Sequence, residues 1–321
     1  MPERPHIAGA LMQTLVVVLP IFALIFAGWI ARRSGALGPH ATEELNRFVV
    51  YLALPALLFD IVAGADWAEI WQPGFVAAFA TGSAVVFAAT VALRLSGRRH
   101  LVDATIDALN AAYANTGFIG FPLAVAVLGP AALAPTLIAT ILTVCVLFAV
   151  ALIMVEVGLQ GERPSGRMVG KVLSRLARNP LLVAPVLGAV VMASGVDLPG
   201  PVESFVDLLG KAASPCALVA LGLFLAQKRP TAEPVLRATL LLGGLKLVGQ
   251  PAITWLAAVQ VFNLTPALAG TATLLAALPT GTGPFMVAEL YNRESGVTSR
   301  VILASTVASL ATLTVLLALV G

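Results

Sequence analysis

The stretch that decides the fold reads Asn115-Thr116-Gly117-Phe118-Ile119-Gly120-Phe121-Pro122, and a similar one reads Leu278-Pro279-Thr280-Gly281-Thr282-Gly283-Pro284-Phe285. Each lies in the middle of an apolar segment, 110–129 or 274–292. Proline removes a backbone donor and glycine frees the chain from helical dihedral angles, so neither segment can be one continuous helix. Matching breaks in the two halves of a membrane-embedded chain indicate a transporter's binding site. The two stretches therefore predict a carrier.

Composition places the chain in the membrane. Of 321 residues, 59% are hydrophobic and only 11% are charged, and the mean hydropathy is +0.96, far from the balance of a soluble domain. At about 20 residues per span, the apolar runs predict an all-α integral membrane protein with ten transmembrane helices. The predicted spans are Leu11–Ala31, Phe48–Val62, Ile70–Leu93, Ala108–Leu128, Ala131–Val155, Leu181–Ser194, Val202–Ala226, Val235–Val259, Ala267–Leu290 and Val297–Val320.

The basic residues predict the orientation of these spans. Of the 19 Lys and Arg residues, 16 lie on the side of the odd-numbered connections and 2, Arg4 and Lys211, on the other, while Lys246 lies inside a span. Such an excess marks the cytoplasmic side of a membrane protein. We therefore expect a multi-pass protein of the cell (inner) membrane with both termini outside. The same distribution explains the net charge of +3 without a nucleic-acid partner.

Helix breakers recur at a nearly constant spacing, which predicts an internal repeat. The pairs are Pro20 and Pro185, Pro55 and Pro215, and Gly117 and Gly281. Five spans per half is an odd number, so the second copy must be inverted relative to the first. The predicted units are 1–158, a basic cytoplasmic linker at 159–179, and 180–321. An apolar stripe in the linker favours a helix on the membrane surface, with a solvated linker as the alternative.

Several motifs together resemble the auxin efflux carrier family over essentially the whole chain. They are the two broken stretches, Tyr51-Leu52-Ala53-Leu54-Pro55-Ala56-Leu57-Leu58-Phe59, Asn179-Pro180 and Ser214-Pro215-Cys216-Ala217-Leu218. The resemblance, together with the short central loop, implies the bacterial malate or malonate permease branch, within the fold superfamily of bile-acid symporters and antiporters. It also implies crossed broken helices 4 and 9, a scaffold of spans 1, 2, 6 and 7, transport spans 3–5 and 8–10, and a homodimer.

The helix breaks supply the predicted substrate site. Each second half-helix, expected to begin near 121–123 or 284–286, presents free amides and a partial positive charge that suit a carboxylate. The resemblance implies that Asn115 contacts that carboxylate; the alternative is that Asn115 only caps unwound backbone. The candidate substrate-binding residues at the breaks are Asn115, Thr116, Gly117, Pro122, Thr280, Gly281, Thr282 and Pro284.

Lys246 and Gln250 complete the predicted substrate-binding set. Lys246 lies deep in the eighth span, where a charge is costly and must face the protein interior, and Gln250 lies one turn later on the same face. Lys246 could be a fixed cation that stabilises unwound backbone or senses substrate charge. Alternatively, it could form a structural ion pair with an interior acid such as Glu289.

Two further polar residues are candidates for coupling. Glu289 lies five residues beyond Pro284 and could titrate in proton coupling, pair with Lys246 or sit among the lipid headgroups. Asn110, near the start of the fourth helix, is the second candidate. The absence of an acid from 131–155 and the presence of Lys246 favour proton coupling or uniport over sodium coupling.

The predicted spans lack the histidine and cysteine arrangements that a membrane-embedded enzyme would need. His6, His40 and His100 lie near loops or the terminus, and Cys145 and Cys216 fall inside apolar runs, so neither a metal site nor a cofactor is expected. The sequence thus predicts a secondary transporter of small mono- or dicarboxylates that works by alternating access. The alternatives are a membrane sensor or channel on the same fold, or a sodium-coupled organic-anion symporter.

Overall fold

The computed structural model describes residues 7–66, 68, 71–160, 170, 173–174, 176–226, 233–293 and 295–320. Within these ranges, every element of secondary structure longer than a single bridge is a helix or a helical turn. The α-helices are α1 (Ile7–Arg33), α2 (Ala41–Phe48), α3 (Leu54–Ala63), α5 (Pro73–Ser96), α6 (Leu101–Ala112), α7 (Phe121–Leu128), α8 (Leu133–Thr140), α9 (Phe148–Gln160), α11 (Pro180–Ser194), α12 (Gly200–Lys211), α13 (Ala213–Leu225), α14 (Glu233–Gly244), α15 (Gln250–Leu256), α16 (Pro266–Ala276), α17 (Gly283–Leu290) and α18 (Gly296–Val320). Shorter turns join some of them: the π-helical η1 (Val49–Ala53), η2 (Thr116–Gly120), η4 (Ile141–Leu147), η5 (Leu245–Gly249) and η6 (Ala257–Val261), and the 3₁₀ turn η3 (Pro130–Ala132).

Many of these helices are suited to a bilayer. Within the described ranges, six continuous helices are long and apolar enough to cross a membrane, and three shorter apolar helices accompany them. The long ones are Ala41–Ala63, Pro73–Ser96, Pro130–Gln160, Gly200–Leu225, Val235–Val261 and Gly296–Leu317; the short ones are Thr116–Leu128, Pro180–Ser194 and Pro266–Ala276. The chain is therefore a multi-pass membrane protein, as its composition predicts.

Three π-helical turns stand directly before prolines. Turns η1, η2 and η5 each end two residues before a proline, at Pro55, Pro122 and Pro251 respectively. Proline has no amide and its ring clashes with the carbonyl one turn earlier, and a wider turn relieves that clash. The helix continues through each proline as a result, instead of ending there.

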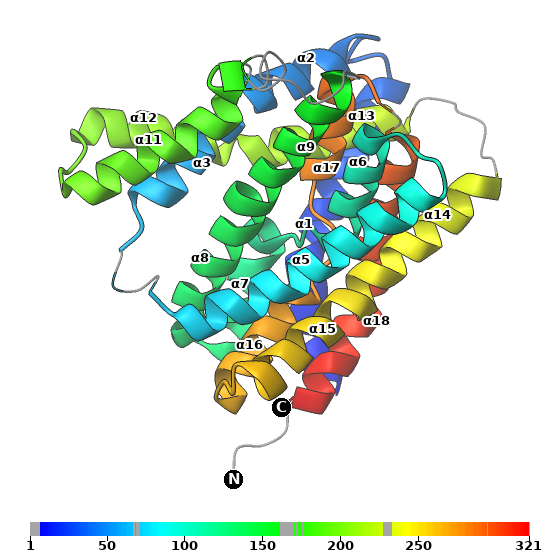
Figure 1. Ribbon diagram of the computed structural model, residues 1–321. Helices are drawn as coiled ribbons and strands as arrows, with labels where there is room; N and C mark the ends of the chain where they lie inside the picture. The colour runs from blue at the N-terminus through cyan, green and yellow to red at the C-terminus, as the bar shows by residue number, and fades with distance from the viewer. Residues whose placement is uncertain are drawn as a thin grey trace.

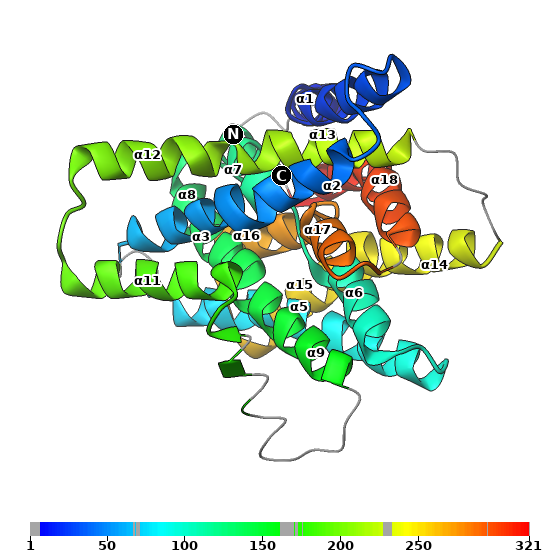
Figure 2. The same ribbon diagram turned by 90° about the horizontal axis from the view of Figure 1, so that it is seen from above.

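One group of helices packs around α1, α3 and α13. Helices α11 and α12 contact α3, while α1 lies along α13 and α2 also contacts α13. In Figure 2, α12 and α13 form one long line with α2 and α3 running beside it. Glycines allow the close approach: a Cβ on Gly28 or Gly222 would collide with the backbone carbonyl of Val219 or Ile25 across the α1–α13 contact. Small residues are the usual means of such packing between membrane helices.

The remaining helices form a second group. Helix α5 contacts α6 and α15, α14 contacts α18, α15 contacts α16, and α6 contacts α9. Figure 1 shows the long α14–α15 line running diagonally, with α5 beside its α15 part and α18 beside its α14 part. The segments between α6 and α7 and between α16 and α17 are largely buried, between this group and α3 of the first group.

Several predicted boundaries need correction. The second half of the first broken helix begins at Thr116 and not near 121–123, because η2 already forms a helical turn before Pro122. The second span starts earlier than predicted, since α2 begins at Ala41. Helix α9 continues to Gln160 and carries the buried Glu156, an acid one residue beyond the predicted end of the fifth span. Most of the predicted 159–179 linker helix, including Met168, lies outside the described residues.

Candidate functional site

The two broken segments meet and pair with each other. The amide of Asn115 donates to the carbonyl of Pro279 at 2.9 Å, and the amide of Gly281 donates to the carbonyl of Tyr113 at 3.0 Å. These bonds form an isolated antiparallel bridge between Ala114 and Thr280. The two unwound backbones thus satisfy part of each other's hydrogen-bonding needs inside the protein. We refer to residues 113–118 and 279–283 together as the crossover.

Free backbone amides gather on the crossover where the helices resume. The carbonyl of Asn115 accepts hydrogen bonds from the amides of Ile119 and Gly120, both at 3.2 Å. These are the first hydrogen bonds of the helical turn, so the amides that precede Ile119 in this turn have no partner within it. Among the described residues, no backbone acceptor is found for the amides of Gly117 and Phe118 in the first segment or of Thr282 and Gly283 in the second. Unpaired amides at helix starts carry partial positive charge and are a ready site for an anion.

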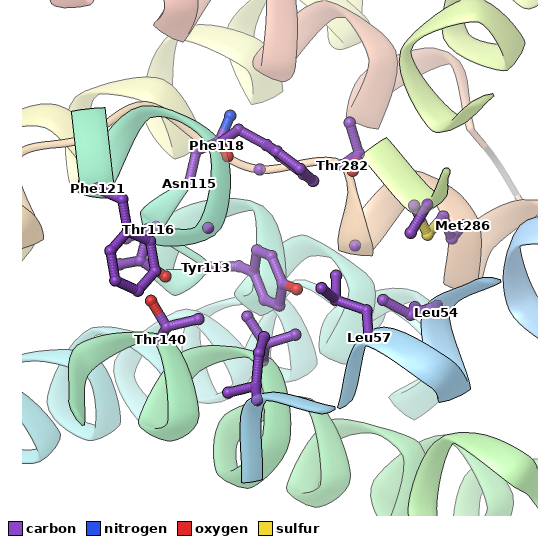
Figure 3. A pocket seen from close by; sticks show the side chains of 17 residues that line it. Leu54, Leu57, Tyr113, Asn115, Thr116, Phe118, Phe121, Thr140, Thr282 and Met286 are labelled. Carbon is purple, nitrogen blue, oxygen red and sulfur yellow. The ribbon is translucent and has the colours of Figure 1, made fainter. Parts of the chain in front are cut away.

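A cavity of about 160 Å³ opens on these amides. A cavity of about 150 Å³ can hold benzene, so the space suits a small organic molecule. Its walls come from the crossover, from α3 and from the α8–η4 helix; the lining residues are Leu54, Leu57, Ile61, Tyr113, Ala114, Asn115, Thr116, Gly117, Phe118, Phe121, Thr140, Val144, Ala213, Gly281, Thr282, Gly283 and Met286. In Figure 3, Asn115 and Phe118 lie above the ring of Tyr113, Leu57 lies beside its hydroxyl end, and Thr140 lies on the opposite side, to the lower left.

Five of the predicted substrate-binding residues line this cavity: Asn115, Thr116, Gly117, Gly281 and Thr282. Asn115 is 5% exposed, and its side-chain amide makes no hydrogen bond to any described residue. The Thr116 hydroxyl is fully buried and also lacks a partner. Buried polar groups are rarely left without partners. Both side chains are therefore free to bind a polar ligand in the cavity.

Tyr113 lines the cavity but is not among the residues predicted from the sequence. Its ring packs so closely on the second broken segment that a Cβ on Gly281 would lie 2.9 Å from ring atom Cε1, and one on Gly283 would lie 2.6 Å from Cζ. The ring also packs against Phe148 at 5.8 Å. The spacing of glycines in the second stretch is the signal that could have indicated a bulky partner there.

The predicted residues Pro122, Pro284 and Thr280 do not line the cavity but shape the crossover. Pro284 lies in the first turn of α17, where a missing amide costs nothing. Pro122 follows the π-helical turn η2, which accommodates its ring. The Thr280 hydroxyl donates to the carbonyl of Asn110 at 2.7 Å, and its amide donates to Ser305 Oγ at 3.1 Å. Thr280 therefore connects the crossover to α6 and α18.

Lys246 and Gln250 bond to the ends of the two first half-helices. Lys246 is fully buried, and its ammonium donates to the carbonyl of Ala276 at the end of α16 at 2.7 Å. Gln250 Nε2 donates to the carbonyl of Ala112 at the end of α6 and to Ser83 Oγ, both at 3.0 Å. Helix C-termini carry partial negative charge and unpaired carbonyls. These two side chains thus neutralise and cap the broken ends, and neither lines the cavity.

The two predicted coupling residues have other partners. Glu289 accepts a hydrogen bond from Ser295 Oγ at 2.5 Å, and Asn110 Nδ2 donates to Thr298 Oγ1 at 2.9 Å while its Oδ1 is buried without a partner. The ammonium of Lys246 has no carboxylate within ion-pair distance in the described part of the chain. The alternative of a Lys246–Glu289 ion pair is therefore wrong.

Acidic side chains at the Arg-rich end of the second helix group are held by ion pairs and hydrogen bonds. Arg293 binds Asp103 through two nitrogens, at 2.8 and 2.6 Å, and Arg94 Nε lies 2.7 Å from Asp107 Oδ2. The Tyr291 hydroxyl donates to Glu156 at 2.9 Å. In the described ranges, no three His, Cys, Asp or Glu side chains form a group that could hold a metal.

An all-helical membrane protein with two broken apolar helices that cross at a cavity has the features of a transport protein. Comparison with known families agrees: residues 14–317 match the family described as "Membrane transport protein". The chain belongs to this auxin efflux carrier-like membrane transport family, which confirms the resemblance drawn from the sequence motifs.

Relatives in three organisms carry transporter names. A protein of Rhizobium meliloti named "Putative malonate transporter" is 34% identical over 309 residues, which cover 95% of each chain. An "Uncharacterized transporter" of Methanothermobacter thermautotrophicus is 28% identical over 75% of this chain and 76% of its own. "Uncharacterized transporter YfdV" of Escherichia coli is 27% identical over 65% of this chain and 68% of its own.

Proposed function

We propose that this protein is a secondary transporter of small organic anions, not an enzyme, and that it holds the substrate carboxylate at the crossover. The observation that carries the proposal is the cavity, on which unpaired amides of two helix starts and the unpartnered side chains of Asn115 and Thr116 converge. Charge-assisted hydrogen bonds from such donors are the strong ones. A carboxylate has the acceptor capacity to satisfy several of them at once.

The proposed mechanism is alternating access between two blocks of helices. Ten spans would form two inverted repeats, 1–158 and 180–321, with spans 1, 2, 6 and 7 as scaffold and spans 3–5 and 8–10 as the moving block. The cavity supports this division, since Leu54, Leu57 and Ala213 come from scaffold helices and Thr140 and the crossover come from the other block. A substrate held at the boundary would change sides when one block moves against the other.

Orientation, assembly and driving force belong to the same proposal. The 16 to 2 bias of basic residues supports cytoplasmic odd-numbered connections and outward termini in the inner membrane, and the family supports a homodimer. Lys246 already supplies a cation to the broken end of α16, which favours transport that does not need sodium. Malonate is the first substrate to test because one relative bears its name.

The test is uptake by purified protein in proteoliposomes. Labelled malonate, malate, succinate, pyruvate and indole-3-acetate are offered with and without proton and sodium gradients. Saturable uptake that shows counterflow and does not change when choline replaces sodium is the expected result. Binding without any flux would support a sensor, non-saturable flux would support a channel, and flux that requires sodium would support a sodium-coupled symporter.

A further inference from the structure

The charges around the cavity point to the substrate class more narrowly. We infer that the site takes a substrate with a single negative charge, whose carboxylate binds the crossover and whose remaining part is uncharged and packs against α3. This inference rests on the proposed function and deepens it. It separates monocarboxylates, and singly charged derivatives of dicarboxylates, from dianions such as malonate.

The two helix starts at the cavity carry a limited positive charge. An α-helix N-terminus carries a partial charge of about +0.5, and the helices at Thr116–Leu128 and Gly283–Leu290 both begin at the cavity. Together they offer about one positive charge. One carboxylate balances that charge, and a second carboxylate would have no counterpart.

Lys246 binds a helix end and does not face the cavity. Its ammonium is fully buried, bonds to the Ala276 carbonyl and does not line the cavity. The C-termini of α6 and α16 carry about half a negative charge each, and one ammonium at these ends offsets them. The positive charge of Lys246 is thus balanced by the broken helices and is not available to the substrate.

The cavity wall formed by α3 and η4 carries no charge. Leu54, Leu57 and Ile61 on α3 and Val144 on η4 make this wall apolar, and Met286 of α17 adds a further apolar side chain to the lining. None of the lining residues is Lys, Arg or His; the polar ones are Tyr113, Asn115, Thr116, Thr140 and Thr282. A second carboxylate facing this wall would be buried without a cation, which is strongly unfavourable. A methyl group, an amide or an aromatic ring would be accepted there.

The experiment varies charge at constant shape. Malonate is compared with its monoamide malonamate, and succinate with succinamate, as competitors of the carboxylate that wild-type proteoliposomes take up best, at a pH of about 7.5. The inference expects each monoamide to compete at least tenfold better than its dianion. Equal or better competition by the dianions would overturn the inference but leave the carrier intact. If no carboxylate of either kind is taken up, the proposed function fails as well.

A substitution tests the apolar wall independently. Leu57→Lys places a cation on α3 opposite the amides, and Leu57→Met is the control that keeps the wall apolar. The Lys variant is expected to reverse the preference toward succinate over succinamate by at least tenfold, and the Met variant is expected to keep the wild-type preference. A Lys variant that is folded by thermal melting and keeps the wild-type preference would contradict the role assigned to this wall.

Discussion

The carbonyl of Tyr113 accepts a hydrogen bond from the amide of Gly281 at 3.0 Å, and the ring of the same tyrosine fills the space where a side chain at position 281 would stand. Tyr113 thus joins the two broken helices through its backbone, and its ring limits how closely they can approach each other. The contact explains why the second stretch needs glycine at this point: a Cβ would lie 2.9 Å from Cε1 of the ring.

Gly281→Ala is expected to lower the stability of the protein by about 1–3 kcal/mol, the usual effect of overpacking a tight interior, and to reduce transport. The matched control is Gly243→Ala on α14, where an added Cβ meets nothing within 4 Å. Thermal melting in detergent and initial uptake rates measure both effects. Equal stability of the two variants would show that the Tyr113–Gly281 contact does not constrain the crossover.

Lys246→Met should destabilise the protein by about 1–3 kcal/mol, because the buried Ala276 carbonyl loses its donor. Lys246→Gln keeps a donor without the charge, so its stability should fall between those of the Met variant and the wild type. Lys211→Met is the control, because Lys211 is exposed in an ion pair with Asp207 on α12 and such pairs contribute little. Wild-type stability and transport in Lys246→Met would show that Lys246 does not stabilise the broken end of α16.

Asp107→Ala should cost about 3–5 kcal/mol, the usual penalty when one partner of a buried ion pair is removed. The pair with Arg94 is well buried, with side chains 7% and 16% exposed. Asp207→Ala breaks the exposed pair with Lys211 and should change stability by less than about 1 kcal/mol. The melting curves of Asp107→Ala and Asp207→Ala measure the two losses of stability. Similar small losses in both would mean that solvent reaches the Arg94–Asp107 pair.

Much of the crossover could be predicted from sequence because its causes are local. The positions of proline and glycine predict where helices must break. The nearly constant spacing between the breakers of the two halves predicts that the two breaks occupy equivalent positions in the repeats. The pairing of Asn115 with Pro279 and the burial of Asn115 at a cavity agree with that expectation.

Other features depend on contacts that sequence does not contain. The depth of Lys246 implies a buried partner but does not say which, and the carbonyl of Ala276 could not be distinguished from the carboxylate of Glu289. The walls at Leu57 and Thr140 come from helices distant in the chain. The turn at Thr116–Gly120 is π-helical, and its wider hydrogen-bond pattern shifts the helix start by five residues from the one that Pro122 alone suggests.

The most direct test of the central claim is the KM of Asn115→Ala for the carboxylate that the wild-type protein transports. A hydrogen bond to a charged group contributes about 1.5–3 kcal/mol, so KM should rise at least tenfold, while the melting temperature stays unchanged because the Asn115 side chain bonds to no described residue. Gln260→Ala, which truncates an exposed amide on η6, should leave both unchanged. An unaltered KM for every transported carboxylate in a folded Asn115→Ala protein would contradict the assignment of the crossover as the substrate site.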